Sequence, residues 1–228
     1  MSNWDKEVVS LTKQAFKNAG NKKMAEGAAN YMKNIAPFIG ISSPIRRKLT
    51  KKAWQNLSKP TEKELINAAK LLWKLPQREY QYAACDLIGK YIDVCTPKTL
   101  EQITVLIKSK SWWDSVDLLG TQVISPLTLK YSQTRKTINK WNNSKNIWLI
   151  RCAIQHQRGH RTKTDVDFVL KICQKHINNS EFFVAKAIGW ALRDFAKINP
   201  KKVREFLRKN PSMSIVSKRE ALKGLNRL

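Results

Sequence analysis

The chain has 228 residues, enough for one large or two small domains, and 42% of them are hydrophobic, including eight tryptophans. It carries 43 Lys and Arg residues against 17 Asp and Glu residues, a formal net charge of +26. With this apolar content the chain can build a core, so the charge is not explained by disorder. The charge favours a polyanionic partner: nucleic acid is the leading candidate, followed by an anionic membrane surface or an acidic protein.

Several common kinds of segment and site are missing from the sequence. No run approaches the roughly eighteen apolar residues of a membrane span, and the amino terminus lacks the basic start and apolar run of a signal peptide. We therefore expect a cytoplasmic protein. The cysteines form no CxxC pair, and scattered cysteines of this kind are typical of buried thiols. His156 and His160 lack the glutamate of a zinc-protease helix, and no glycine-rich nucleotide loop occurs, so we expect neither a metal nor a cofactor.

Helix boundaries follow one another along the first half of the chain. Glycine or proline marks the ends, and a capping residue followed by proline or glutamate marks the starts. In chain order these are Gly20 and Pro37 as ends, Ser43-Pro44 as a start, Thr61-x-x-Glu64 as a capping box, Pro76 as an end and Thr96-Pro97 as a start. Residues 78–94 continue the helical periodicity between the last two.

The second half shows the same signals. Helices are expected over residues 112–130, about 133–141 and 146–157. Further starts are expected after Thr164, after Ser180, at Asn199-Pro200 and at a second capping box, Ser217-x-x-Glu220. Alternating hydrophobic strands are absent, so the sequence predicts an all-α protein of about a dozen helices.

Helix pairs recur every ~35–40 residues, the period of helical solenoid repeats. A solenoid bends into a concave surface, and a concave basic surface suits a DNA duplex. No linker is evident, and we expect one domain over residues 1–228.

One pair of residues is especially informative. Trp113 and Asp117 are four residues apart, a spacing that places an indole and a carboxylate on one face of a helix. In so basic a protein, this pair would suit a cationic group carried by a polyanion, such as an alkylated purine in DNA. The structural alternative is a helix start with Asp114 near the positive end of the dipole and the tryptophans in the core.

Positive charge gathers in two stretches. One follows a capped helix start and contains Arg46, Arg47, Lys48, Lys51 and Lys52. The other has twelve basic residues: Lys186, Arg193, Lys197, Lys201, Lys202, Arg204, Arg208, Lys209, Lys218, Arg219, Lys223 and Arg227. Each stretch could be a solvated face, but the excess over acidic residues favours contact with phosphates.

Several motifs, taken together and in order, resemble the bacterial AlkD-like alkylpurine DNA glycosylases, which are built of HEAT-like helical repeats. The resemblance runs over nearly the whole chain. It is carried by residues 31–34 (YMKN), 38–41 (FIGI), 43–47 (SPIRR), 111–117 (SWWDSVD), 146–151 (NIWLIR), 181–183 (EFF), 186–193 (KAIGWALR) and 217–221 (SKREA). Residues 156–161 differ from the lysine-bearing stretch that the resemblance implies, although Arg158 and Arg161 keep its charge.

The resemblance implies a role for each matched position. Trp113, Asp117, Arg151 and Trp190 would line the lesion site, and Tyr31 would lie near the same cleft. Residues expected to contact DNA are Tyr31, Ser43, Arg46, Arg47, Arg158, Arg161, Arg193, Lys197, Lys218 and Arg219. The implied reaction is hydrolysis of the N-glycosidic bond of N3- or N7-alkylated purines in duplex DNA, which leaves an abasic site, in a bacterial repair enzyme associated with the nucleoid.

This chemistry fits the residue types. An alkylated purine is already cationic and leaves readily, so the enzyme has to stabilise positive charge as it moves to the deoxyribose. Indole faces attract cations, and Asp117 can stabilise the sugar cation and orient water. Arg151 could hold either a phosphate or Asp117.

We therefore expect a monomeric, monofunctional glycosylase without metal or cofactor. The alternatives are a non-catalytic module that binds DNA of unusual structure and a scaffold for an acidic protein.

Overall fold

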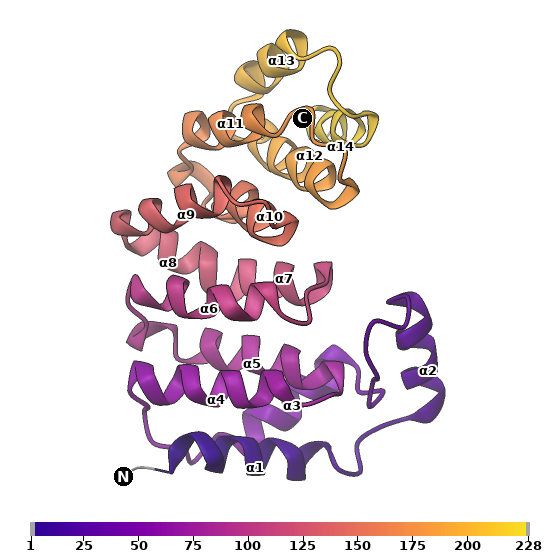
Figure 1. The fold of residues 1–228 in the computed structure, drawn as a ribbon, viewed down its shortest axis with the longest axis vertical. Helices are drawn as coiled ribbons and strands as arrows, with labels where there is room; N and C mark the ends of the chain where they lie inside the picture. Colours follow the sequence, from indigo (N-terminus) through magenta and orange to yellow (C-terminus); the bar gives the residue numbers. More distant parts are fainter. Residues whose placement is uncertain (1–2, 227–228) are drawn as a thin grey trace. The chain divides into compact units, whose positions relative to one another are not determined.

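The computed structural model describes residues 3–226, and all regular structure in this part of the chain is helical (Figure 1). The all-α prediction is confirmed. Contacts divide the chain into two compact units, Met1–Leu106 and Ile107–Leu228. A single domain stays a prediction. Arg227, the last of the twelve basic residues, lies outside the described residues.

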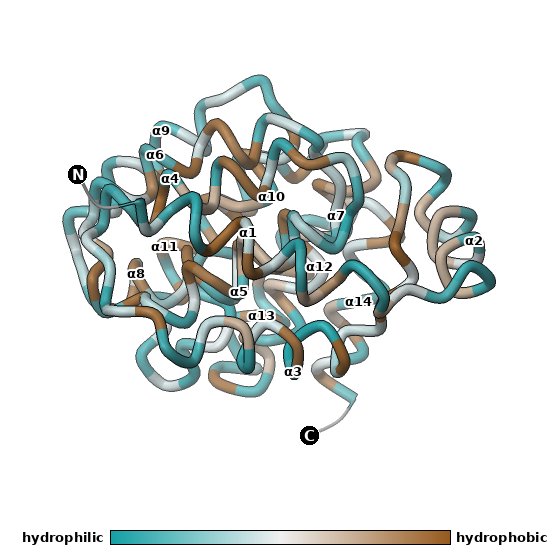
Figure 2. Tube along the Cα trace, turned by 90° about the horizontal axis from the view of Figure 1, so that it is seen from below, coloured by the Kyte–Doolittle hydropathy of each residue, from teal (hydrophilic) through white to brown (hydrophobic). Residues whose placement is uncertain are grey.

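The first unit is built from helices that bury one apolar face each. They are α1 (Trp4–Phe16), α2 (Lys22–Tyr31), α3 (Ser43–Ala53), α4 (Glu62–Lys74), α5 (Arg78–Lys90), the short 3₁₀ turn Ile92–Val94 and α6 (Lys98–Lys108), whose last two residues belong to the second unit. Helix α4 packs on α5 and α1, and α1 also packs on α3. Figure 2 shows the hydrophobic and hydrophilic stretches that alternate along the helices, the pattern that gives each helix an apolar face.

Local signals set most of these boundaries. The Thr61 hydroxyl accepts a hydrogen bond from the Glu64 amide, and the Glu64 carboxylate accepts one from the Thr61 amide, so the predicted capping box is confirmed. Helix α4 ends at Lys74, before Pro76, as predicted. Pro44 lies in the first turn of α3, but the N-cap is Ser42, one residue earlier than expected.

Helix α2 is an exception because it has no buried residue. Its flanking loop is held by Glu79, whose buried carboxylate accepts hydrogen bonds from the amides of Ile39, Gly40 and Ile41 at 2.8–3.2 Å. Gly40 has a φ of +87°, and a Cβ at that position would lie 2.1 Å from the carbonyl oxygen of Asn21. The segment 38–41 is therefore fixed between Glu79 and the start of α2, and it needs glycine at position 40. Helix α2 itself stands apart from α1 and α4 in Figure 1.

The second unit carries the residues of the Trp113–Asp117 motif. Its helices are α7 (Trp113–Leu119), a π-helical turn (Gly120–Ile124), α8 (Ser125–Lys130), a 3₁₀ turn (Ser132–Thr134), α9 (Arg135–Asn142), α10 (Ile147–Gln155), a second 3₁₀ turn (Arg161–Lys163), α11 (Val166–Lys175), α12 (Phe182–Ala196), α13 (Pro200–Lys209) and α14 (Ile215–Leu225). The helix expected over 112–130 is thus interrupted by the π-turn, a feature often found beside functional sites.

Helices α12 and α14 form the most extensive helix pair of this unit, and a glycine allows them to approach closely. A Cβ on Gly189 would lie 2.7 Å from the Glu220 Cβ and 2.9 Å from the Ser217 carbonyl oxygen. The Ser217 hydroxyl donates to the carbonyl oxygen of Ala185 at 2.6 Å.

The capping box predicted at Ser217 is wrong. The N-cap of α14 is Ser214, three residues earlier than expected, and the helix begins at Ile215. Ser217 and Glu220 both make contacts to α12 instead. The two residues that resembled a cap are used for packing between helices, which local sequence does not reveal.

All four cysteines (Cys85, Cys95, Cys152 and Cys173) are buried free thiols, as expected. Burial raises the pKa of Cys173 to about 12, so this thiol stays protonated. Among residues 3–226, no helix is both long and apolar enough to span a membrane.

Candidate functional site

Asp117 and Arg151 form the centre of the candidate site in the second unit. Trp113 begins α7, and Asp117 follows one helical turn later, as the spacing predicted. The Asp117 oxygens accept hydrogen bonds from Arg151 Nε and Nη2, both at 2.7 Å. The pair is largely shielded from water, because the Arg151 side chain is 2% exposed and the Asp117 side chain 14%. This is the bidentate geometry of a strong arginine–carboxylate pair.

The same contacts determine what Arg151 does. Its third bond runs from Nη1 to the carbonyl oxygen of Phe183 at 2.7 Å. With all three nitrogens engaged and the side chain buried, Arg151 holds Asp117 rather than a phosphate. Of the two roles that the sequence left open, the structure selects this one.

The two neighbouring tryptophans have different surroundings. Trp112 packs against Trp148 and Phe183, with ring centroids 5.9 and 5.1 Å away, and its indole N–H is buried without a hydrogen-bond partner. Trp113 is half-buried at the start of α7. Trp112 is also half-buried, so neither tryptophan is a core residue, and Trp112 is linked to Arg151 through Phe183, whose ring it contacts.

Trp190, on α12, is surrounded by cations. The charged groups of four basic side chains lie 5.0–6.0 Å from the centroid of its ring: Arg151, Arg158, Lys186 and Arg193. The indole is therefore already engaged by the protein's own cations. A further cation would meet repulsion at this ring.

Comparisons with known proteins agree with this architecture. A family model described as DNA alkylation repair enzyme matches residues 12–225. The chain belongs to the DNA alkylation repair enzyme family. A solved structure of a predicted DNA alkylation repair enzyme from Enterococcus faecalis is 28% identical, with a TM-score of 0.85, and the match covers 92% of this chain and 98% of that one. A search of curated proteins finds no match.

Membership of the DNA alkylation repair family implies a DNA substrate, and contact of the basic residues of the second unit with that DNA stays a prediction. Three of those expected to contact DNA line one cavity of about 600 Å³: Arg158, Arg161 and Lys197. Lys218 and Arg219 are exposed on α14. Arg193 is engaged differently, because its Nη1 donates to Glu220 at 2.8 Å.

In the first unit, the repair enzyme exposes Tyr31, Ser43 and Arg47, and Tyr31 is 71% exposed at the end of α2. Arg46 requires a correction. It is 2% exposed, its Nε donates to Asp86 at 3.1 Å, and its guanidinium lies 4.9 Å from the Tyr82 ring centroid. A side chain buried in this way cannot reach a phosphate, so Arg46 anchors α3 to α5 instead. A single surface shared by both units stays a prediction.

Two contributors were not among the predicted site residues. The Phe183 carbonyl, which binds Arg151, is a backbone group and has no sequence signal. Glu220 binds Lys186 and Arg193 from α14. In the sequence, Glu220 was noted as part of an expected capping box and of the 217–221 motif, and the Lys186–Trp190–Arg193 spacing places three side chains on one helical face, but neither signal joins Glu220 to these cations.

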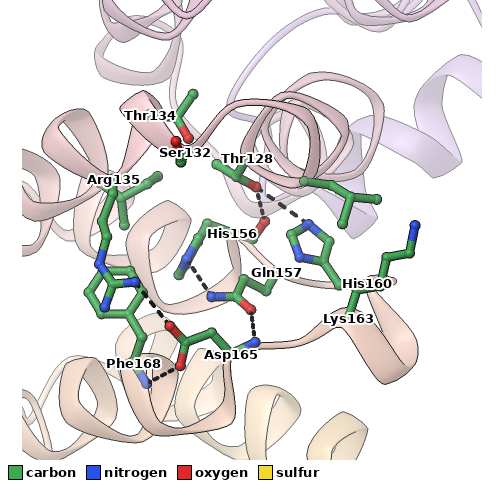
Figure 3. A pocket seen from close by; sticks show the side chains of 12 residues that line it. Thr128, Ser132, Thr134, Arg135, His156, Gln157, His160, Lys163, Asp165 and Phe168 are labelled. Atoms are coloured by element: carbon green, nitrogen blue, oxygen red, sulfur yellow. Dashed lines mark hydrogen bonds and ion pairs between the residues drawn. The ribbon is translucent and has the colours of Figure 1, made fainter.

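The histidine pair lies in a separate cavity of about 210 Å³ (Figure 3). The two ring nitrogens of His156 contact the Ala153 carbonyl at 2.7 Å and the Gln157 amide nitrogen at 3.0 Å. His160 Nε2 lies 2.9 Å from the Ser125 carbonyl oxygen. Burial lowers the pKa of His156 to about 4, so this ring is neutral at neutral pH. The pair acts as part of a hydrogen-bond network that joins α10 to its neighbours.

Proposed function

We propose that this member of the family is a monofunctional DNA glycosylase, acting as a monomer in the bacterial cytoplasm. It would hydrolyse the N-glycosidic bond of cationic N3- or N7-alkylated purines in duplex DNA and leave an abasic site. The observation that carries the proposal is the Asp117 carboxylate, which is held by Arg151 beside Trp113 in a DNA alkylation repair enzyme.

The substrate needs little help in losing its base. When the N-glycosidic bond breaks, its electron pair moves to the purine, which becomes neutral, and no general acid is needed. Positive charge then develops on the deoxyribose. A fixed carboxylate stabilises this charge, because its orientation costs nothing at the moment of reaction.

Asp117 keeps the capacity for this role despite its partner. A carboxylate has about four acceptor positions, and Arg151 occupies two of them. The remaining positions can face the sugar or accept a hydrogen bond from the attacking water. That water forms the new bond to the sugar carbon and loses its proton to Asp117 or to solvent. Arg151 fixes the direction of the carboxylate, so reaction geometry depends on a residue that need not touch DNA.

The assignment of Trp190 changes within this mechanism. Its ring lies among four cations, so a cationic base would not be favoured there. We assign recognition of the positive charge to Asp117 with Trp113, and place Trp190 beside the DNA backbone.

One assay tests the proposal. The full chain is incubated with a duplex that contains a single N7-methylguanine, and free base is measured against a reaction without protein. A glycosylase releases base faster than the uncatalysed reaction. The second candidate, a non-catalytic DNA-binding module, is supported by the basic surface residues such as Arg47 and Lys218. Binding of the duplex without release of base would favour that candidate and refute the glycosylase.

A further inference from the structure

Glu220 occupies an unusual position for an acidic residue. Its side chain is 5% exposed and accepts three cations: Lys186 Nζ at 2.8 Å, Arg193 Nη1 at 2.8 Å and Lys223 Nζ at 3.0 Å. Burial alone would raise the pKa of Glu220, but the hydrogen bonds from Lys186 and Lys223 outweigh it and lower the pKa to about 2. Glu220 is therefore an anion at every physiological pH.

The two cations on α12 flank the Trp190 ring. Lys186 lies four residues before Trp190 and Arg193 three residues after it, so the three side chains share one face of α12. Their charged groups lie 6.0 and 5.5 Å from the ring centroid. Glu220 uses a different carboxylate oxygen for each cation, and it thereby fixes the separation of the ammonium and the guanidinium.

Both cations still have donors available. The side chains of Lys186 and Arg193 are 28% and 26% exposed, and each uses one nitrogen for Glu220. An ammonium has three donors and a guanidinium five, so several N–H groups remain for an anion. The cluster has three cations for one carboxylate, so it keeps a positive surplus.

We propose that Glu220 is a positioning residue that presents Lys186 and Arg193, beside the Trp190 ring, as a fixed receptor for one phosphate of the DNA backbone. Long basic side chains normally lose rotamer freedom when they bind a phosphate. Glu220 imposes that order before DNA arrives, because it holds both chains already. Removing this one negative charge is therefore expected to weaken DNA binding, opposite to what charge alone predicts.

The proposal rests only on the DNA-binding part of the proposed function. Its test uses undamaged duplex, so it does not depend on base release. If the wild-type chain binds DNA but releases no base, the glycosylase proposal fails while this one can still be judged.

The experiment compares Glu220→Gln with Glu205→Gln in the full chain. Glu205 is the matched control, because it is an exposed carboxylate on α13 that pairs with Lys209 at 2.7 Å and lies outside the cluster. Affinity for a fluorescent duplex is measured over a range of salt concentrations, with melting temperature to confirm folding. Glu205→Gln should bind equally or slightly more tightly. Glu220→Gln should bind several-fold more weakly, and its log–log salt slope should fall by about one unit, the loss of one phosphate contact.

A second pair of variants covers the case in which Glu220→Gln fails to fold and excludes an indirect effect. The double variant Lys186→Met/Arg193→Met should itself lose about one unit of slope. Adding Glu220→Gln to that background should leave the slope unchanged and should not weaken binding, because Lys186 and Arg193 are then no longer there for Glu220 to position. The proposal is overturned if folded Glu220→Gln behaves like Glu205→Gln, if the double variant keeps the wild-type slope, or if Glu220→Gln weakens binding in the double-variant background.

Discussion

The pair formed by Arg151 and Asp117 leads to a prediction about stability and activity together. Arg151→Met removes one partner of a buried ion pair and leaves Asp117 without its two donors. Breaking such a pair costs about 3–5 kcal/mol of unfolding free energy, because a charge remains buried without compensation. The double variant Arg151→Met/Asp117→Leu removes both charges and leaves only the Phe183 carbonyl without its donor, which costs about 1–3 kcal/mol.

Urea denaturation of the wild type, Arg151→Met, Asp117→Leu and the double variant measures these differences. We expect the double variant to be more stable than Arg151→Met alone. Base release should be lost in all three variants, whereas the salt slope of duplex binding should stay at the wild-type value, because Arg151 does not contact phosphate. Strictly additive costs, or a slope that falls by one unit in Arg151→Met, would refute the assignment of Arg151 as the holder of Asp117.

The other predictions concern surface charge and pH. Arg47→Gln and Lys218→Gln should each lower the log–log salt slope of duplex binding by about 0.9, because both side chains are exposed. Arg46→Met should leave the slope unchanged and lower the melting temperature, because Arg46 is buried. Equal slopes for Arg46→Met and Arg47→Gln would contradict this expectation. His156 has a folded-state pKa of about 4 against an ordinary 6.5, so the unfolded chain binds the proton more readily, and stability is complete above pH 6.5 and lost as the pH falls toward 4. Between pH 7 and pH 5 the wild type should lose about 2 kcal/mol of unfolding free energy because of His156. In urea titrations over this pH interval, His156→Gln should lose less stability than the wild type. An unchanged pH dependence in the variant would show that His156 is not the cause.

Local sequence patterns correctly predicted the features that depend only on residues close together in the chain. Thr61 and Glu64 are three residues apart, and Pro76 acts on the residues just before it, so each boundary could be predicted from its neighbours. The same holds for Trp113 and Asp117, because a helix alone places them on one face. Sequence resemblance then supplied the family, which local patterns alone could not.

The errors and open alternatives concern partners that are distant in sequence. Arg46 resembled a DNA contact because its burial depends on Asp86, 40 residues further along the chain. The role of Arg151 stayed open because Asp117 is 34 residues away. Ser217 resembled a cap, although its hydroxyl donates a hydrogen bond to Ala185 on α12. In each case a helix packed in three dimensions decides what a basic or polar side chain meets, and sequence spacing does not contain that information.

The most direct test of the account compares Asp117→Asn with Asp114→Asn. Both residues are on α7 and both substitutions remove one negative charge, but Asp114 lies in the first turn, where an acidic residue stabilises the helix start. The measurement is the single-turnover rate of N7-methylguanine release from duplex DNA at saturating protein.

The account predicts that Asp117→Asn lowers this rate by about 10²–10³, the scale for losing one preorganised stabilising group, while binding of undamaged duplex is kept. Asp114→Asn should lower the melting temperature and leave the rate close to that of the wild type. Equal and small effects of the two substitutions on the rate would contradict the assignment of Asp117 as the group that stabilises the sugar cation.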